Sequence, residues 1–422
     1  MFRTSAARRA SRLARSFATV LDTAGVKVAA VDNGEATSAV TFLVKAGSRY
    51  QNKPGVAHAL QNFAFKSTSK RSALGTIRES ELYGGVLSSS LSREHLAVTA
   101  EFLRGDEPFF VDVLSSFFTN AKFTRHELQE YVAPVCEAES TSSASNPASH
   151  AIELAHALAF RNGLGLPLYA SAHSHISVED VKQFASSVFT KDNVAVLGTG
   201  ISQEALSKLV EQTLSSLGTS GSVSSSSSSY FGGETRVDSH EGPQTVFIGF
   251  GQAGAFSPEL AVLNAHLSTE PSVKWSKGTS PLSANIPANS SVQTVLLPYS
   301  DASLFGLLVQ GATTEDVKAA GKAAIAALKE AGSIKGEELQ KAIAKAKFTA
   351  ASAAEGRTGI VSALGPKVLS GSASTLENTL SAFDKVQTSA FSSATASLLK
   401  AKPTYVAVGD IKTLPYADEL GL

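Results

Sequence analysis

Residues 58–62 read His58-Ala59-Leu60-Gln61-Asn62, and this stretch decides how the rest of the chain is interpreted. Positions 58 and 62 are four apart, so their side chains share one face if the segment is a helix. A histidine can bind a metal ion, whereas the amides of Gln61 and Asn62 are poor zinc ligands and have no useful basicity near neutral pH. The stretch therefore offers one metal-binding side chain and no base.

The spacing is that of the H-x-x-E-H motif of zinc peptidases. In that motif two histidines bind zinc and the glutamate polarises the attacking water. Here Gln61 stands at the position of the glutamate, and Asn62 stands at the position of the second histidine. The frame of the motif is present, but the groups that would carry out hydrolysis are absent.

Three flanking stretches extend this near-match. Residues 44–49 have the pattern V-x-x-G-S-R, residues 65–71 have F-K-x-T-x-x-R, and residues 84–94 have G-G-x-L-x-x-x-x-S-R-E. Their order resembles the N-terminal half of the pitrilysin family of metallopeptidases. In that family a glutamate farther along the chain is the third zinc ligand, and the resemblance places Glu139 there, with Glu137 close by. Two ligands without a base imply neither tight zinc binding nor hydrolysis, so we predict no metal, no cofactor and no catalytic residue.

The composition is that of a globular protein. The chain has 422 residues, of which 43% are hydrophobic and 18% are charged, and this length allows two to four ordinary domains. No uninterrupted apolar run approaches the ~18 residues needed to cross a bilayer. Cys136 is the only cysteine, so an intrachain disulfide is impossible, which suits a reducing compartment.

The N-terminus has the composition of a mitochondrial presequence. Residues 1–21 contain five arginines and several serines and alanines, and the first acidic residue is Asp22. Arg15-Ser16-Phe17 resembles a matrix processing site, so we predict that residues 1–16 are removed. The mature chain then has 32 basic residues against 37 acidic ones, a net charge of −5, and no basic patch indicates nucleic-acid binding.

A linker divides the chain almost in half. Residues 218–233 are rich in serine and glycine, which predicts a flexible tether. The stretch Val194–Gly198 resembles Val406–Gly409, and Val40–Gly47 resembles Val246–Gly251, at offsets of 212 and 206 residues. An internal repeat this long indicates a duplicated domain. We therefore predict an N-terminal domain over residues 17–217 and a C-terminal domain over residues 234–422.

Each predicted domain combines strands and helices. Residues 314–331 have Thr313 or Thr314 as the N-cap, acidic residues in the first turn and apolar residues at helical spacing. Residues 335–354 continue with a second helical pattern. Half-exposed strands with pairs of helices predict the α+β class, in which two homologous pitrilysin-like sandwiches carry helices on mainly antiparallel sheets.

Two C-terminal motifs narrow the resemblance within the family. Residues 299–306 have the pattern Y-S-D-x-x-L-F-G, and residues 409–420 have G-x-x-x-x-x-P-Y-x-D-E-L. In active relatives the first motif brings a tyrosine to the zinc site. Here we expect Tyr299 to serve packing and hydrogen bonding, as we expect of His156 in a helix.

Both motifs resemble the non-catalytic core subunits of mitochondrial ubiquinol–cytochrome c reductase. That resemblance implies a scaffold on the matrix side of the inner membrane, within a dimeric complex. It would contact a second core subunit, cytochrome b, cytochrome c1, the Rieske iron–sulfur protein and small subunits, without holding haem or quinone itself.

Two other functions remain open. The first is the non-catalytic, substrate-binding subunit of the mitochondrial processing peptidase, which carries a long glycine-rich loop where residues 268–282 stand. This segment has one glycine, Gly278, which argues against a role in capturing peptides. The second is an active zinc peptidase, which the loss of the base at Gln61 disfavours.

Overall fold

The computed structural model describes residues 20–32, 34–171, 174–219, 221, 223, 225–270, 280–371 and 376–422. The predicted presequence, residues 1–16, lies outside this part of the chain, as do residues 271–279 of the segment 268–282. The chain divides into two compact units. Unit 1 comprises the described residues of Met1–Ser140, Pro167–Ser225 and Ala353–Thr379, and unit 2 comprises those of Thr141–Leu166, Ser226–Ser352 and Leu380–Leu422.

Unit 1 is built on a six-stranded sheet in the order β1-β2-β6-β3-β5-β4. Neighbouring strands are antiparallel except β2 and β6, which run parallel. The strands are β1 (Leu21–Thr23), β2 (Val26–Val31), β3 (Thr37–Val44), β4 (Val86–Leu91), β5 (Leu96–Leu103) and β6 (Val194–Thr199). β3 is rich in β-branched and aromatic residues and is buried along most of its length, which fits its central place in the sheet.

The motif residues of unit 1 hold its turns together. Arg49, from the first motif, forms a buried ion pair of 2.8 Å with Glu94, from the third. Gly47 has no side chain because a Cβ atom there would lie 2.3 Å from the backbone of Arg93. A Cβ atom at Gly85 would likewise lie 2.1 Å from the ring of Phe110. The sequence patterns that flank residues 58–62 are therefore packing requirements of this fold.

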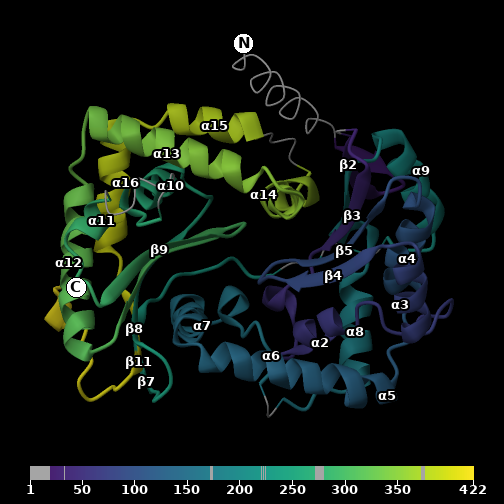
Figure 1. Ribbon diagram of the computed structural model, residues 1–422, viewed down its shortest axis with the longest axis horizontal. Helices are drawn as coiled ribbons and strands as arrows, with labels where there is room; N and C mark the ends of the chain where they lie inside the picture. Colours follow the sequence, from purple (N-terminus) through teal and green to yellow (C-terminus); the bar gives the residue numbers. More distant parts are fainter. Residues whose placement is uncertain are drawn as a thin grey trace. The chain divides into compact units, whose positions relative to one another are not determined.

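Helices cover both faces of the first sheet. The helices are α2 (Val56–Asn62), α3 (Ala73–Leu82), α4 (Glu107–Asn120), α5 (Arg125–Glu127), α6 (Ala133–Ser145), α8 (Val178–Val188), α9 (Gln203–Thr213) and α14 (Arg357–Leu369). Most lie on one face, where they enclose the main hydrophobic core (Figure 1). α14 covers the opposite face, where Val368 and Leu369 pack against Leu43 and Leu197.

Unit 2 repeats this plan with a five-stranded sheet in the order β7-β11-β8-β10-β9. Its strands are β7 (Gly233–Asp238), β8 (Gln244–Ala253), β9 (Ser290–Pro298), β10 (Ala302–Gly311) and β11 (Thr404–Gly409). The pair β7 and β11 is parallel, and the remaining pairs are antiparallel. The strand order matches β2-β6-β3-β5-β4 of unit 1 position by position, which confirms the predicted repeat and the α+β class.

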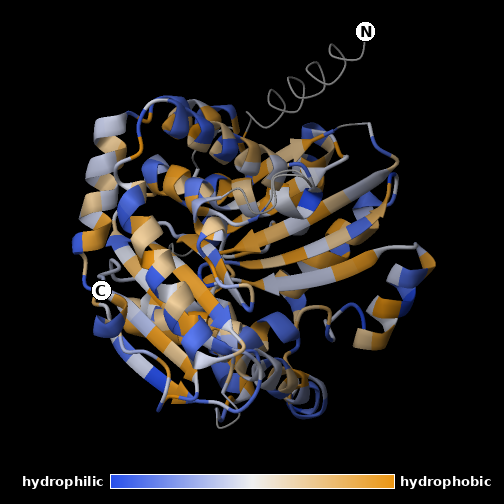
Figure 2. Cartoon of the chain, turned by 60° about the vertical axis from the view of Figure 1, so that its left-hand side comes forward, coloured by the Kyte–Doolittle hydropathy of each residue, from blue (hydrophilic) through white to orange (hydrophobic). Residues whose placement is uncertain are grey.

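The helices of unit 2 also lie on both faces of their sheet. They are α7 (Pro147–Phe160), α10 (Pro258–Leu267), α11 (Pro281–Ala284), α12 (Thr314–Ala331), α13 (Glu337–Ala353), α15 (Leu376–Asp384) and α16 (Thr388–Lys400). α12 has the predicted bounds, and the Thr313 side chain caps it by accepting a hydrogen bond from the Asp316 N–H. Figure 2 shows strands that are largely hydrophobic and helices that alternate between hydrophobic and hydrophilic residues, as helices with one buried face should.

The compact units differ from the predicted domains 17–217 and 234–422 at two helices. α7 comes from the N-terminal half of the sequence, but its Ala151, Ala155 and Ala159 pack in unit 2 on Phe247 and neighbouring strand residues. α14 comes from the C-terminal half and packs in unit 1. Each sheet is therefore covered on one face by a helix encoded in the other half of the chain.

The described end of the predicted tether is more ordered than its composition suggests. In unit 1, the Arg49 Nε atom donates a 2.7 Å hydrogen bond to Ser225 Oγ. In unit 2, the Ser228 amide and hydroxyl both donate to the Asp301 carboxylate, at 2.8 and 3.0 Å. Tyr230 packs beside the cluster that α7 forms with the second sheet. Hydrogen bonds to charged side chains thus fix serines that the sequence alone leaves unrestrained.

Within the described ranges, no helix is both long and apolar enough to span a lipid bilayer.

Candidate functional site

Helix α2 places His58 and Asn62 on the same side, as their spacing predicts. Both side chains meet Glu139 of helix α6. The Nε2 atom of His58 lies 2.6 Å from Glu139 Oε2, and Asn62 Nδ2 donates to the same oxygen at 3.0 Å. Glu137, the neighbouring candidate, is exposed to solvent. The structure therefore brings together three of the four residues of the degenerate motif and selects Glu139 over Glu137.

The ring of His58 is fully buried and uses both nitrogen atoms. The backbone N–H of Ala170 donates to Nδ1 at 3.1 Å, so the ring proton resides on Nε2 and points at Glu139. The ring of Tyr169 lies edge-on at 5.1 Å. Burial lowers the pKa of His58, and the hydrogen bond and charge of Glu139 oppose that shift only in part. His58 is thus a neutral imidazole that donates to a carboxylate.

The amide of Asn62 closes the space where a second histidine would bind zinc. Its Nδ2 atom donates to Glu139 Oε2, to the backbone oxygen of His58 at 3.3 Å and more weakly to Cys136 Sγ at 3.5 Å. A zinc ligand must offer a lone pair, whereas this group offers N–H donors. The residues present therefore do not fit a zinc ion, and the part of the chain described contains no cluster of three or more His, Cys, Asp or Glu side chains able to hold a metal.

Gln61 makes its contacts with strand β4. Its Nε2 atom donates to the backbone oxygen of Ser89 at 3.4 Å, and the Ser89 hydroxyl donates to the Gln61 backbone oxygen at 3.5 Å. Both bonds are long, so they contribute little individually. An amide in this position cannot accept a proton from water at neutral pH, so Gln61 cannot act as a general base.

Cys136 is a buried thiol beside this network. Burial raises its pKa to about 12, while the hydrogen bond from Asn62 acts in the opposite direction. A thiol with such a pKa stays protonated at physiological pH and is not a nucleophile. The hydrogen bonds of this network connect α2 to α6 and to the backbone at Ala170. The residues present can therefore stabilise the packing of these segments.

His156 and Tyr299 form a hydrogen-bonded pair in unit 2, which confirms that both residues serve packing and hydrogen bonding. His156 Nδ1 donates to the backbone oxygen of Ile152 at 2.7 Å, and the Tyr299 hydroxyl donates to His156 Nε2 at 2.6 Å. Both rings belong to, or pack beside, the cluster under α7. Tyr299 thus serves packing and hydrogen bonding within its own unit.

Two neighbours of His58 in the degenerate site could not be predicted from the sequence. Ala170 and Tyr169 reach His58 from a loop more than a hundred residues away, and a backbone donor leaves no residue-specific signal. Ser89 lies within the third flanking motif, but its contact with Gln61 depends on how β4 lies against α2. Only the pairing of positions 58 and 62 follows from local spacing.

Comparison with known protein families identifies both halves of the chain. Residues 27–172 match the family described as Insulinase (Peptidase family M16), and residues 175–346 match the Peptidase M16 inactive domain. The structure of a protease from Helicobacter pylori is similar with a TM-score of 0.81, covering 93% of this chain and 99% of that one. At 16% identity this likeness concerns the fold alone.

The chain is also similar over its full length to proteins named Cytochrome b-c1 complex subunit 2, mitochondrial. The protein of that name from Cryptococcus neoformans is 46% identical, with 100% of this chain and 98% of the relative covered. The one from Yarrowia lipolytica is 37% identical, with 96% and 97% covered. The similarity therefore extends well beyond the region of the degenerate motif.

Proposed function

Because the chain belongs to peptidase family M16, we propose that it is a member which has kept the peptidase fold and serves as subunit 2 (core protein 2) of mitochondrial ubiquinol–cytochrome c reductase. The observation that carries the proposal is the full-length similarity to relatives of that name, at up to 46% identity. Its role there is structural: it supports the assembly and stability of the respiratory complex and has no active site of its own.

The degenerate site supports the absence of catalysis. Hydrolysis by this family's motif requires a base and two histidine ligands on one helix. Here Gln61 bonds to β4, and Asn62 directs N–H donors at Glu139. The remaining pair, His58 and Glu139, is satisfied internally. These residues stabilise the helices they join, so the former catalytic frame contributes to folding.

The proposed partners are core protein 1, cytochrome b, cytochrome c1, the Rieske iron–sulfur protein and the small subunits of a dimeric complex. We place the chain at the matrix side of the inner membrane, as a peripheral subunit. The arginine-rich segment 1–16 and the single cysteine, Cys136, support this location. We further propose that residues 17–217 and 234–422 are the duplicated domains, joined by 218–233, and that α7 and α14 are exchanged between them.

Native gel electrophoresis of mild-detergent extracts tests the proposal. A tagged, full-length chain expressed in its own cells should migrate with cytochrome b, and mass spectrometry of the band should find cytochrome c1 and core protein 1. A matched control carries the same tag on an unrelated matrix protein. The proposal is overturned if the chain migrates apart from cytochrome b.

The same gel distinguishes the alternative. A substrate-binding subunit of the mitochondrial processing peptidase would be recovered in a soluble heterodimer with a zinc-binding partner. We expect no such species, because the segment 268–282 carries a single glycine where that subunit has a glycine-rich loop. A soluble heterodimer with peptidase activity on presequences would favour the alternative.

A further inference from the structure

Helix α3 presents its apolar residues to solvent. Leu74, Ile77 and Leu82 are 55%, 48% and 86% exposed, and Val86, just beyond the helix, is 64% exposed. The side of α3 that faces the protein carries Thr76 and Ser80, both buried. A surface helix normally buries its apolar stripe and exposes its polar one, so α3 is reversed. Several large apolar side chains exposed on one helix are a feature of interaction surfaces.

The reversed helix is firmly fixed to unit 1. The Ser72 side chain caps its N-terminus by accepting from the Gly75 N–H. Arg71 donates to Glu79 on α3 at 2.8 Å and to Asp112 on α4 at 2.7 Å. Tyr83, at the end of the helix, stacks on Phe109 with ring centroids 4.4 Å apart. The exposed stripe is therefore held in one position before any partner binds, which lowers the entropic cost of association.

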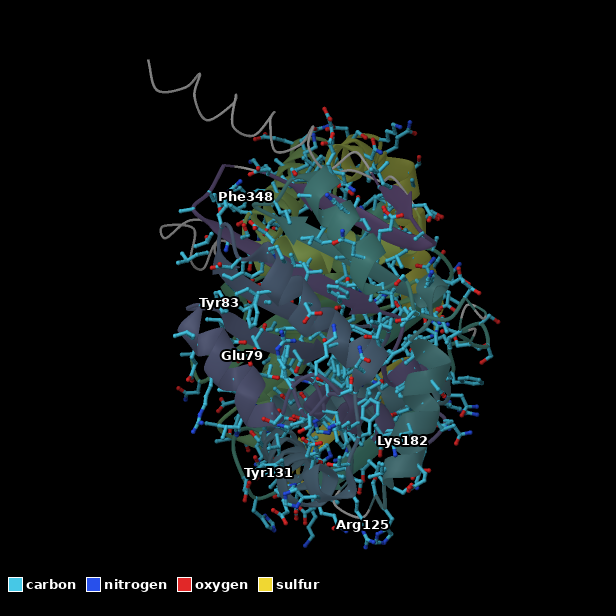
Figure 3. The ribbon with its side chains drawn as sticks, turned by 90° about the vertical axis from the view of Figure 1, so that its right-hand side faces the viewer. Glu79, Tyr83, Arg125, Tyr131, Lys182 and Phe348 are labelled. Atoms are coloured by element: carbon cyan, nitrogen blue, oxygen red, sulfur yellow. The ribbon has the colours of Figure 1, made fainter. Side chains whose placement is uncertain are left out.

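Two opposite charges lie within the stripe. Arg78 and Glu81 are exposed, and they lie on the same face of α3 as Leu74. Neither forms an ion pair or side-chain hydrogen bond with any residue that the structure describes. Along the helix, Arg78 and Glu81 lie at equal distances on either side of the midpoint between Glu79 and Ser80. Ile77 and Leu82 are placed symmetrically about the same midpoint. Figure 3 turns this side of the unit toward the viewer, with Glu79 and Tyr83 labelled.

This placement makes the stripe complementary to itself. If a second copy of α3 lies antiparallel to the first, about a two-fold axis at that midpoint, each Arg78 meets Glu81 of the other copy. Ile77 then comes level with Leu82 of the other copy, and Leu74 comes level with the segment that carries Val86. A two-fold interface requires this reciprocity, in which one residue contacts a second and the second contacts the first across the axis.

We infer that the stripe Leu74, Ile77, Arg78, Glu81, Leu82 and Val86 is a docking surface for a second copy of this chain. The inference rests on the exposure and charges of α3 and does not depend on the proposed function. One helix from each copy makes a small interface, below about 1,200 Å² in total, so the isolated chain should dimerise weakly, in the micromolar range.

Charge reversal tests the pairing with the full-length mature protein. Arg78→Glu alone places four acidic side chains around the axis, and Glu81→Arg alone places four basic ones. Each single variant should weaken dimerisation at least about tenfold in sedimentation equilibrium, because like charges at an interface repel. The double variant Arg78→Glu/Glu81→Arg restores opposite charges and should return the dissociation constant to near the wild-type value.

Lys182→Glu on helix α8, labelled in Figure 3, is the matched control, because it reverses an exposed charge of the same unit away from α3. It should leave the dissociation constant unchanged. Circular dichroism should show that all variants are folded, since every altered side chain is exposed. A wild-type chain that stays monomeric throughout the micromolar range overturns the inference. So does a dimer that the single variants weaken and the double variant fails to restore, which would assign the stripe to a different protein.

Discussion

At the scale of single residues, His58, Asn62 and Glu139 form one hydrogen-bonded network that joins two helices. His58 is held by a backbone N–H on one side and by Glu139 on the other, so its imidazole is neutral and oriented. Asn62 adds a second donor to the same carboxylate oxygen. The network is internally satisfied, and a satisfied buried network makes its helices costly to separate.

The stability of the site should depend on pH through His58. Burial lowers its folded pKa below the ordinary value of 6.5, so the unfolded chain takes up this proton first. The stabilising contribution is therefore complete above 6.5 and is lost as pH falls toward the folded pKa. His58→Gln removes the titration and should cost about 1–3 kcal/mol at neutral pH.

Urea unfolding of the wild type and His58→Gln at several pH values checks this prediction. The difference in unfolding free energy should shrink as the pH falls below 6.5, because the folded pKa of His58 is lowered. A constant difference would mean that folding leaves the pKa of His58 unchanged, and a difference that widens as the solution becomes more acidic would mean that folding raises this pKa.

The geometry also predicts that metal binding can be restored. Replacing Gln61 by Glu and Asn62 by His together returns the base and the second ligand beside His58 and Glu139, which already approach to 2.6 Å. We expect about one zinc ion per chain, measured by metal analysis after dialysis. Adding His58→Ala to this double variant should abolish uptake. A folded double variant without zinc would mean that Glu139 cannot act as the third ligand.

At the scale of helices and strands, the C-terminal motif is explained by one arginine on β7. Arg236 donates to the backbone oxygens of Ile411, Leu414 and Pro415, at 2.6, 2.7 and 2.9 Å. Its guanidinium group also lies 3.9 Å from the ring centroid of Tyr416. A planar group with several donors can satisfy carbonyls that point in different directions.

Replacing Arg236 by Lys should therefore destabilise the protein although the charge is kept. A single ammonium cannot reach all three oxygens, and hydrogen bonds to charged donors contribute about 1.5–3 kcal/mol each. We expect a loss of about 2 kcal/mol or more in chemical denaturation. Arg125→Lys, at an exposed position on α5, is the control and should change stability by less than about 0.5 kcal/mol. Equal stability of Arg236→Lys and wild type would contradict this account.

Several helices and strands could be predicted from the sequence, whereas the sheet against which each helix packs could not. Helix α12 begins and ends where its cap and apolar spacing indicate. Periodicity reports that a helix has a buried face, but it does not report which sheet lies against that face. The sequence therefore predicted a helix at His156, which is α7, without revealing that it packs in unit 2, and it made no specific prediction for α14. The contacts of Ser225 and Ser228 escaped prediction for the same reason, because their partners are distant in sequence.

At the scale of the whole molecule, the exchange of α7 and α14 makes the two halves of the sequence dependent on each other. Without α14, the first sheet would expose Leu43, Leu197 and their neighbours. Without α7, the second sheet would expose Phe247, Leu304 and Val406. Exposed apolar faces of this size favour aggregation rather than an independently stable domain.

Separate expression of residues 17–217 and 234–422 tests this dependence. Each fragment alone should be insoluble or bind a hydrophobic dye strongly, whereas co-expression should recover a soluble complex of both. The control is the intact protein cut by a protease site inserted within 218–233 after folding, which should stay in one piece on a sizing column. Two fragments that each unfold cooperatively on their own would contradict the prediction.

The exchanged helices also set an order of events during synthesis. The strands of the first sheet are complete once residue 199 has left the ribosome, but the helix that covers their second face ends at Leu369. While the intervening 170 residues are made, one face of the first sheet stays exposed. This face is hydrophobic, and no helix of the N-terminal half covers it. We therefore expect such a chain to need molecular chaperones until Leu369 has been made, so that its yield depends on the supply of chaperones as well as on its own sequence.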